Sequence, residues 1–150
     1  MSEFHVAVGD HTTFSKTVTE SDVYLFAGIT GDFAPNHVNK AFMEKSSYRR
    51  PIAHGALLIG FMSAAATQAL GALRASPEEV PVSLGYDRVR FLAPVFFGDT
   101  VTVEYRVSAI DDERRRASAD IRVVNQDGTL VAVATQVLKW VTKEQGTQRA

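Results

Sequence analysis

The hydrophobic positions of this chain change their spacing about halfway along it. From Ile52 to Leu73 no Asp, Glu, Lys or Arg occurs, and an uncharged apolar run of this length predicts a helix, roughly Ala53 to Leu73, with hydrophobic residues on nearly all sides. From Thr100 to Ile110 apolar and polar residues alternate, which predicts a half-buried strand. A long buried helix and a sheet are therefore the two main parts expected of the fold.

Shorter patterns, punctuated by glycine and proline, predict the remaining elements. Thr19 precedes early acidic residues and a helical apolar stripe, so a helix is expected to start there and to be stopped by Gly28 and Gly31. Pro35 then favours a turn, and a polar connector, Ser76–Pro81, is expected after the long helix. The other expected elements are strands at Thr12–Val18, Val82–Phe91 with an irregularity near Asp87, Ala117–Val124 and Leu130–Val141, and a short helix at Asn39–Lys45.

Four or five antiparallel strands with one long apolar helix indicate an α+β fold in which a single sheet curls around the helix. The chain has 150 residues and suits one domain, residues 1–150. One sheet cannot cover a helix that is hydrophobic on all sides, so we expect a second copy of the chain to cover the remaining face, in a homodimer or a dimer-based oligomer. The alanines and glycines of the helix favour close packing inside a protein over a membrane span.

Composition and charge narrow the classes of partner. The formal net charge is −1 at pH 7, which provides no concentrated basic surface for nucleic acid or a membrane. The run Arg114–Arg116 is short and flanked by acidic residues, as expected of a solvated turn. Absence of cysteine excludes disulfides and thiolate catalysis and fits a reducing compartment. The N-terminus also lacks an export signal, so we expect a cytoplasmic protein.

The candidate chemistry lies in the segment Gly31–His37. Asp32 and His37 stand five positions apart across a proline-containing turn, and a carboxylate and an imidazole held on one rigid turn can share a water molecule as a general acid/base pair. The alternative is structural, because Asp after Gly is a common turn residue and a single exposed His is ordinary. The four histidines show no metal-ligand spacing, so no metal site is expected.

Two positions on the long helix are further candidates. Gly55 opens the helix, where backbone N–H groups lack intrahelical partners and favour negative charge, so its amide is a candidate oxyanion site. Gly55 equally suits tight packing against a strand. Ser63 lies about two turns further on, either as a hydrogen-bond partner of Asp32 or as a small core residue, and it lacks the sequence context of a serine-hydrolase nucleophile. Four arginines near these segments either meet substrate phosphates or are simply solvated: Arg49, Arg50, Arg88 and Arg90.

Three segments together resemble, in order and in spacing, the MaoC-like dehydratases, also called hydratase 2 or (R)-specific enoyl-CoA hydratases, which have the hot-dog fold. The segments are Gly31–His37, Arg50–Gly55 and Phe91–Asp99. The likeness extends over roughly Phe14–Val141. Each segment is weakly specific alone, but the ordered set is specific.

The resemblance implies a reaction and a role for each candidate residue. Asp32 and His37 would activate water for reversible addition to a trans-2-enoyl thioester, giving an (R)-3-hydroxyacyl thioester. The Gly55 amide would hold the thioester oxygen, and Ser63 stands where the family has a serine near the catalytic Asp. The substrate would be an acyl-CoA or an acyl carrier protein thioester, and no cofactor is expected.

The loop departs from the family pattern at Ala34, Asn36 and Asn39, where the family usually has Asn, an aliphatic residue and often Asp. Two other functions fit parts of the same sequence. A hot-dog thioesterase shares the buried helix and the oxyanion amide, but it needs a carboxylate that drives water onto the thioester carbon. A non-catalytic acyl-thioester-binding subunit would leave Asp32 and His37 without a role. Free-thiol release and turnover of an enoyl thioester distinguish the three.

Overall fold

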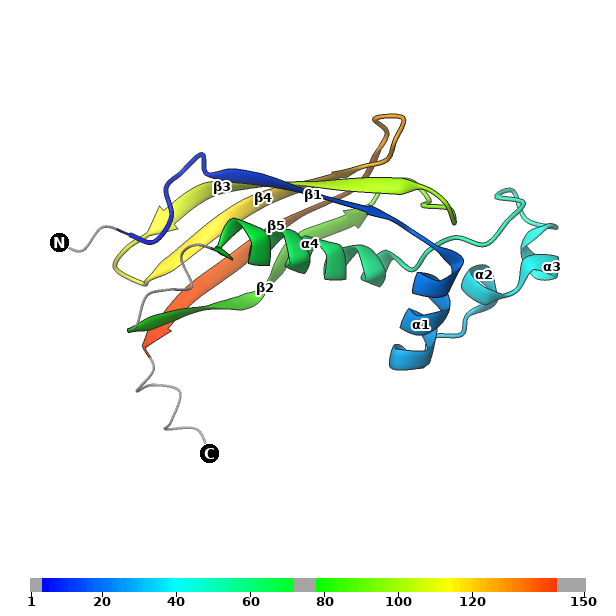
Figure 1. The fold of residues 1–150 in the computed structure, drawn as a ribbon, viewed down its shortest axis with the longest axis horizontal. Helices are drawn as coiled ribbons and strands as arrows, with labels where there is room; N and C mark the ends of the chain where they lie inside the picture. Colours follow the sequence, from blue (N-terminus) through cyan, green and yellow to red (C-terminus); the bar gives the residue numbers. More distant parts are fainter. Residues whose placement is uncertain (1–3, 72–77, 143–150) are drawn as a thin grey trace.

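The computed structural model describes residues 4–71 and 78–142. Figure 1 shows an antiparallel sheet that curves around one helix, with shorter helices beyond one end of the sheet. This arrangement confirms the predicted α+β class of fold. The helices are α1 (Glu20–Thr30), α2 (Pro35–Val38), α3 (Lys40–Met43) and α4 (Gly55–Ala69), and the strands are β1 (His11–Thr17), β2 (Glu79–Phe91), β3 (Thr100–Asp111), β4 (Arg116–Val124) and β5 (Leu130–Thr142).

The sheet has the strand order β1-β3-β4-β5-β2, and every neighbouring pair is antiparallel. Strands β3, β4 and β5 follow one another as a meander, as the sequence predicted, while β1 and β2 form the two edges. The predicted alternation along β3 is also confirmed, because its buried apolar side chains occupy every second position. They are Val101, Val103, Tyr105 and Val107, and they join the core beneath α4.

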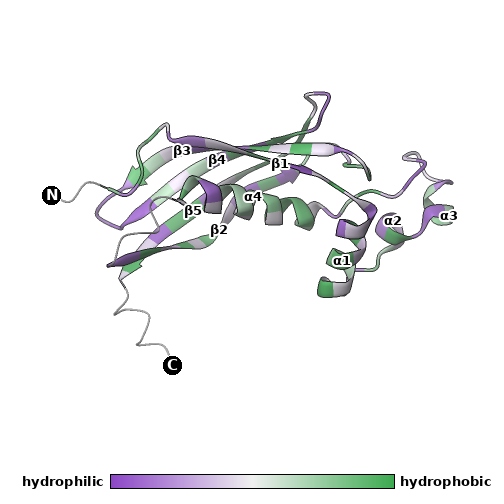
Figure 2. Cartoon of the chain, viewed as in Figure 1, coloured by the Kyte–Doolittle hydropathy of each residue, from purple (hydrophilic) through white to green (hydrophobic). Residues whose placement is uncertain are grey.

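Helix α4 packs its large hydrophobic side chains against the sheet, chiefly against β1 and β3. Figure 2 shows hydrophobic colouring along most of the helix. The helix is shorter than the predicted Ala53 to Leu73, because His54 is its N-cap and its last residue is Ala69; Leu73 lies outside the described residues. No helix among the described residues is long and apolar enough to cross a membrane.

One side of α4 is not covered by the described residues of its own chain. The exposed positions on that side are Ala56, Gly60, Ser63 and Thr67, whereas Leu58, Phe61, Met62, Ala65 and Ala66 are buried. The open side therefore carries small or weakly polar residues, among them an alanine and a glycine of the kind from which close packing was expected. Small side chains leave room next to the helix backbone for another molecule.

The first helix begins as predicted, and of the two glycines expected to stop it, Gly31 ends it and Gly28 does not. Thr19 caps α1 in a capping box with Asp22, and the helix continues through Gly28 to Gly31, which has a left-handed backbone with φ 81°. Pro35 was expected in a turn but is the first residue of the short helix α2. Proline is suited to that position, because the first N–H of a helix has no intrahelical acceptor.

Strand β2 is longer than predicted, because Glu79–Pro81 belongs to the strand and not to a connector. Proline is tolerated here since β2 is an edge strand, where one row of backbone groups is left unpaired. The first part of the expected connector, Ser76 and Pro77, lies outside the described residues. The irregularity expected near Asp87 is confirmed as a register shift between Asp87 and Arg90.

Glu79 anchors the end of the sheet that lies away from α1, α2 and α3 (Figure 1). Arg115 donates to it from Nε at 3.1 Å and from Nη2 at 2.5 Å, and His5 donates from Nε2 at 2.6 Å. The Arg115 hydrogen bonds, followed by that of His5, lower the pKa of Glu79 from 4.5 to about 2. Because the folded state lowers this pKa, the ionised carboxylate stabilises the fold above about pH 4.5, and that stabilisation is lost as the pH falls towards 2.

We predict that Glu79→Gln lowers the free energy of unfolding at pH 7 by at most about 3 kcal/mol, the value that corresponds to the full pKa shift. The difference from the unsubstituted protein should shrink between pH 4.5 and pH 2. Urea unfolding at several pH values measures it. The matched control is Glu104→Gln, since Glu104 pairs with Arg122 on the exposed surface and such pairs contribute under about 1 kcal/mol. Equal effects of the two substitutions at all pH values would contradict the prediction.

Candidate active site

The end of α1 places Asp32 at the surface. Gly31 takes the left-handed conformation without the steric cost that a side chain would bring, so the chain turns away from the helix at this point. Asp32 Oδ1 accepts a hydrogen bond from the Ala34 N–H at 3.2 Å. Its side chain is 52% exposed, so the carboxylate is open to water while its turn is held against the start of α2.

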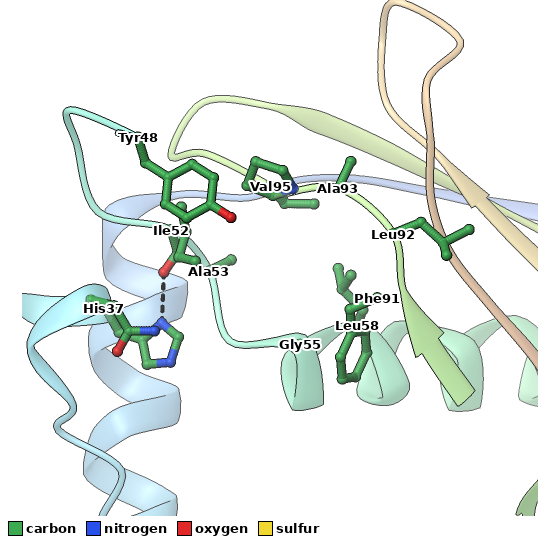
Figure 3. A pocket seen from close by; sticks show the side chains of 12 residues that line it. His37, Tyr48, Ile52, Ala53, Gly55, Leu58, Phe91, Leu92, Ala93 and Val95 are labelled. Carbon is green, nitrogen blue, oxygen red and sulfur yellow. Dashed lines mark hydrogen bonds between the residues drawn. The ribbon is translucent and has the colours of Figure 1, made fainter. Parts of the chain in front are cut away.

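His37 is buried in α2 and fixed by the backbone. Its Nδ1 lies 2.8 Å from the carbonyl oxygen of Ile52, as Figure 3 shows. A carbonyl oxygen only accepts hydrogen bonds, so Nδ1 carries the hydrogen and the neutral ring keeps its lone pair on Nε2. The Ile52 N–H in turn donates to the Asn36 carbonyl at 3.0 Å. The segment before α4 therefore holds His37 with a basic nitrogen free.

His54 belongs to the same cluster, although it was not assigned a role from the sequence. It is 2% exposed, its Nε2 donates to the backbone carbonyl of Asp32 at 3.0 Å, and its ring stacks on that of His37 with centroids 3.7 Å apart. Phe26 of α1 packs against the His54 ring at 4.8 Å. One buried ring thus contacts both members of the predicted pair. The only available signal was a histidine within an otherwise uncharged apolar run.

The fold brings Asp32, His37 and His54 together, with side-chain donor atoms all within 4.8 Å of one another. Such a separation allows one water molecule to bridge the carboxylate and the imidazole. The sequence spacing of the histidines predicted no metal site, yet this is a donor set that can hold a metal ion. Spacing along the chain missed it because His54 approaches from another element. His37 Nδ1 and His54 Nε2 each already donate to a backbone carbonyl.

Gly55 and His37 both line a cavity of about 290 Å³, together with Phe91 at the end of β2 (Figure 3). Gly55 is the first residue of α4, so its amide lies at the positive end of the helix dipole. A Cβ built on Gly55 would lie 2.5 Å from the Phe91 ring. Gly55 is therefore required for close packing against β2, the structural alternative considered above, and its backbone also faces the cavity.

Within one chain, the structure does not bring Ser63 to Asp32. Among the described residues, the polar contacts of the Asp32 carboxylate are with Ala34 and His54. Ser63 lies two turns into α4 and lines a second cavity with Ser83. The predicted hydrogen bond between Ser63 and Asp32 is therefore not formed within the chain, because Asp32 lies beside the first turn of the helix.

Residues 4–129 match the family model for the MaoC like domain. The chain belongs to the MaoC-like domain family. An (R)-specific enoyl-CoA hydratase of Aeromonas caviae is 33% identical over 139 residues, which cover 93% of this chain and 98% of that relative. An (R)-specific enoyl-CoA hydratase of Rhodospirillum rubrum is 37% identical over 107 residues, covering 71% and 69%.

The solved structure of the (R)-hydratase from A. caviae superimposes on this MaoC-like chain with a TM-score of 0.79 at 32% identity. The superposition covers 89% of this chain and 96% of that one. Both the family resemblance and the hot-dog fold that it implied are thereby confirmed.

The three departures of this MaoC-like chain from the expected loop pattern fall at positions whose hydrogen bonds do not require the family's usual residues. Ala34 contributes its backbone N–H to the Asp32 carboxylate, and Asn36 contributes its backbone carbonyl to Ile52. Asn39 Oδ1 caps α3 by accepting from the Phe42 N–H at 2.9 Å, a role that Asn fills as well as Asp. The three changes therefore do not prevent Asp32 and His37 from lying next to each other.

Proposed function

We propose that this protein catalyses the reversible addition of water to a trans-2-enoyl thioester, giving an (R)-3-hydroxyacyl thioester. The observation that carries the proposal is the position of Asp32 and His37 within water-bridging distance of each other, beside a cavity that the first residue of α4 also lines. The (R)-specific enoyl-CoA hydratase of A. caviae, which this chain matches over 98% of its length, supports the same reaction.

In the proposed reaction, water lies between the Asp32 carboxylate and His37 Nε2. As the water oxygen bonds to C3 of the enoyl group, one of its protons passes to the pair, and the π electrons of the C2–C3 double bond move towards the thioester oxygen. The pair then returns a proton to C2, and the thioester carbonyl re-forms. Hydrogen and hydroxyl are thus added across C2 and C3 without any change in oxidation state.

The start of α4 suits the negative charge that this reaction builds. The thioester oxygen becomes enolate-like in the transition state, and the Gly55 N–H lies where the helix dipole favours an anion. Donors that are fixed before the reaction need no reorganisation as the charge appears, and losing one such donor typically costs about 10²–10³ in kcat. Gly55→Pro would remove this N–H, but its ring would also clash with Phe91, since a Cβ at position 55 lies 2.5 Å from the Phe91 ring. The side chains therefore provide the test.

Cationic residues beside the site favour coenzyme A as the carrier. Lys40, Arg49 and Arg50 line a small cavity of about 210 Å³ together with Glu44 and Pro51, and Pro51 directly precedes Ile52 in the wall of the catalytic cavity. Lys40 also pairs with Glu20 at 2.7 Å, which leaves the two arginines as the main candidates. Guanidinium and ammonium groups are the usual protein ligands of phosphate. The Arg50 guanidinium stacks over the Phe96 ring at 3.9 Å, which limits its motion. We therefore propose that these residues meet the phosphates of an acyl-CoA.

We predict that Asp32→Asn and His37→Gln each lower kcat for crotonyl-CoA hydration by about 10²–10⁴-fold, the usual contribution of a general acid or base. Loss of the enoyl absorbance measures hydration, and a thiol reagent measures release of free CoA in the same reaction. His11→Gln and Asp10→Asn are matched controls at the other end of β1. They should retain activity, and so should the unsubstituted protein in the presence of a chelator.

Activity that survives both Asp32→Asn and His37→Gln would contradict the assignment of the pair. Release of CoA in step with loss of absorbance would instead indicate a thioesterase. Inactivation by the chelator, reversed by a divalent metal, would show that the donor cluster of Asp32, His37 and His54 acts as a metal site.

We further propose that the protein is a homodimer joined along strand β2. This edge strand is 13 residues long, and it exposes the hydrophobic side chains Val80, Val82 and Leu84. An uncovered edge with apolar side chains offers both backbone hydrogen bonds and apolar area to another strand. Pairing with the same strand of a second copy satisfies both partners equally in a twofold-symmetric dimer.

Sedimentation equilibrium at micromolar concentration tests the homodimer. We predict a dimer for the unsubstituted protein and a monomer for Val82→Lys, because a twofold axis brings both introduced charges to the interface. Val8→Lys changes a valine away from β2 that is more exposed than Val82, and this variant should remain dimeric. A monomeric unsubstituted protein, or a dimer that is insensitive to Val82→Lys, would contradict the proposed interface.

A further inference from the structure

A second cavity, of about 400 Å³, lies further along α4 than the catalytic cavity. Ser63 of α4, Ser83 of β2 and Gln136 of β5 line it. The catalytic cavity is lined by Gly55 of α4 and Phe91 of β2, so the two cavities lie between the same helix and the same strand. An acyl chain whose thioester oxygen meets Gly55 and that runs along α4 would head towards the second cavity.

The wall of the second cavity contains a buried hydrogen-bond network. Gln136 is 1% exposed, and its Oε1 accepts from the hydroxyl of Tyr105, itself buried, at 2.9 Å. Gln136 Nε2 donates to Ser83 Oγ at 3.0 Å and to the Tyr86 hydroxyl at 3.2 Å. The hydrogen bond from Tyr105 thus fixes the orientation of the Gln136 side-chain amide. Both hydrogens of this amide point to hydroxyl groups beside the cavity.

This orientation makes the cavity wall a hydrogen-bond donor. Because Ser83 and Tyr86 accept from Gln136, each keeps its own hydroxyl hydrogen for donation. Ser63 also lies close enough to Tyr86 to affect its hydroxyl: burial raises the pKa of Tyr86, and hydrogen bonding with Ser63 and Ser83 opposes that rise. The hydroxyl hydrogens of Ser83 and Tyr86, which the Gln136 amide does not use, are therefore available for donation to a group in the cavity.

We propose that this cavity selects enoyl thioesters whose acyl chain carries an oxygen acceptor, a hydroxyl or a carbonyl, towards its far end. A plain alkyl chain would displace water from the Ser63 and Ser83 hydroxyls. Their hydrogen bonds to that water would then be lost without replacement, which is unfavourable. An oxygen on the chain replaces them. Ser63 lies eight residues beyond Gly55, about 12 Å along the helix, which matches an acyl chain of medium length. The inference rests on the proposed function for the thioester end of the ligand.

The test compares 10-hydroxy-trans-2-decenoyl-CoA with trans-2-decenoyl-CoA, which differ only in the terminal hydroxyl. We expect kcat/KM to be about tenfold higher for the hydroxylated substrate, the effect of one net hydrogen bond. Ser83→Ala and Gln136→Leu should each bring the ratio close to one. Thr135→Val is the matched control, because Thr135 directly precedes Gln136 in β5 and donates to Asp120 instead of lining the cavity. This variant should keep the preference for the hydroxylated substrate.

Calorimetric binding of the saturated 10-hydroxydecanoyl-CoA and decanoyl-CoA gives a readout that needs no turnover. The same tenfold preference is expected in Kd, with the same response to Ser83→Ala. If crotonyl-CoA is not hydrated while this binding preference is present, the proposed reaction is wrong and the subsite stands. Equal or weaker binding and turnover of the hydroxylated compounds, or a preference that both substitutions leave unchanged, would overturn the inference.

Discussion

The buried contacts of the His54 ring are the constraint on which the catalytic arrangement depends. The ring stacks on His37, packs against Phe26 and donates to the carbonyl of Asp32. A hydrogen bond and an aromatic contact contribute about 1 kcal/mol each, while fixing the backbone of one residue costs roughly 1–2 kcal/mol. These contacts can therefore hold only a short segment. Pro35 limits the conformations that have to be excluded, because its ring fixes φ, whereas Gly31 adds to them.

Because His54 is also the N-cap of α4, the same ring ties the acid/base pair to the helix terminus. The pair and the Gly55 amide then belong to one rigid unit, whose position is set by the burial of α4 against the sheet. The buried side of α4 carries its large residues, including Phe61 and Met62, and the open side carries small ones. Both cavities are lined by residues of α4 and of β2.

The sequence predicted those parts of the structure that depend on local periodicity. Alternation identified β3, and the uncharged run identified α4, because core burial imposes those patterns directly. The ends of elements were predicted less well. Pro35 begins a helix and Pro81 lies within a strand, and both outcomes depend on which backbone N–H groups the fold leaves unpaired, which the local sequence does not reveal.

The candidate site was predicted in its two side chains but not in their surroundings. Asp32 and His37 lie within one short segment, so their proximity followed from the turn. The role of His54 depends on a carbonyl 22 residues away along the chain, and the surroundings of Ser63 depend on β2 and β5, so neither was visible in the sequence. The homodimer and the cytoplasmic location stay predictions.

The most direct test of the central claim is to follow the oxygen atom of the water molecule. Crotonyl-CoA is incubated with the protein in ¹⁸O-labelled water, and the products are identified by mass spectrometry and chiral chromatography. We predict (R)-3-hydroxybutyryl-CoA with the label on C3 and the thioester intact. Label in the carboxylate of free crotonate, with release of CoA, would show that water attacks the thioester carbon and would contradict the proposed role of Asp32 and His37.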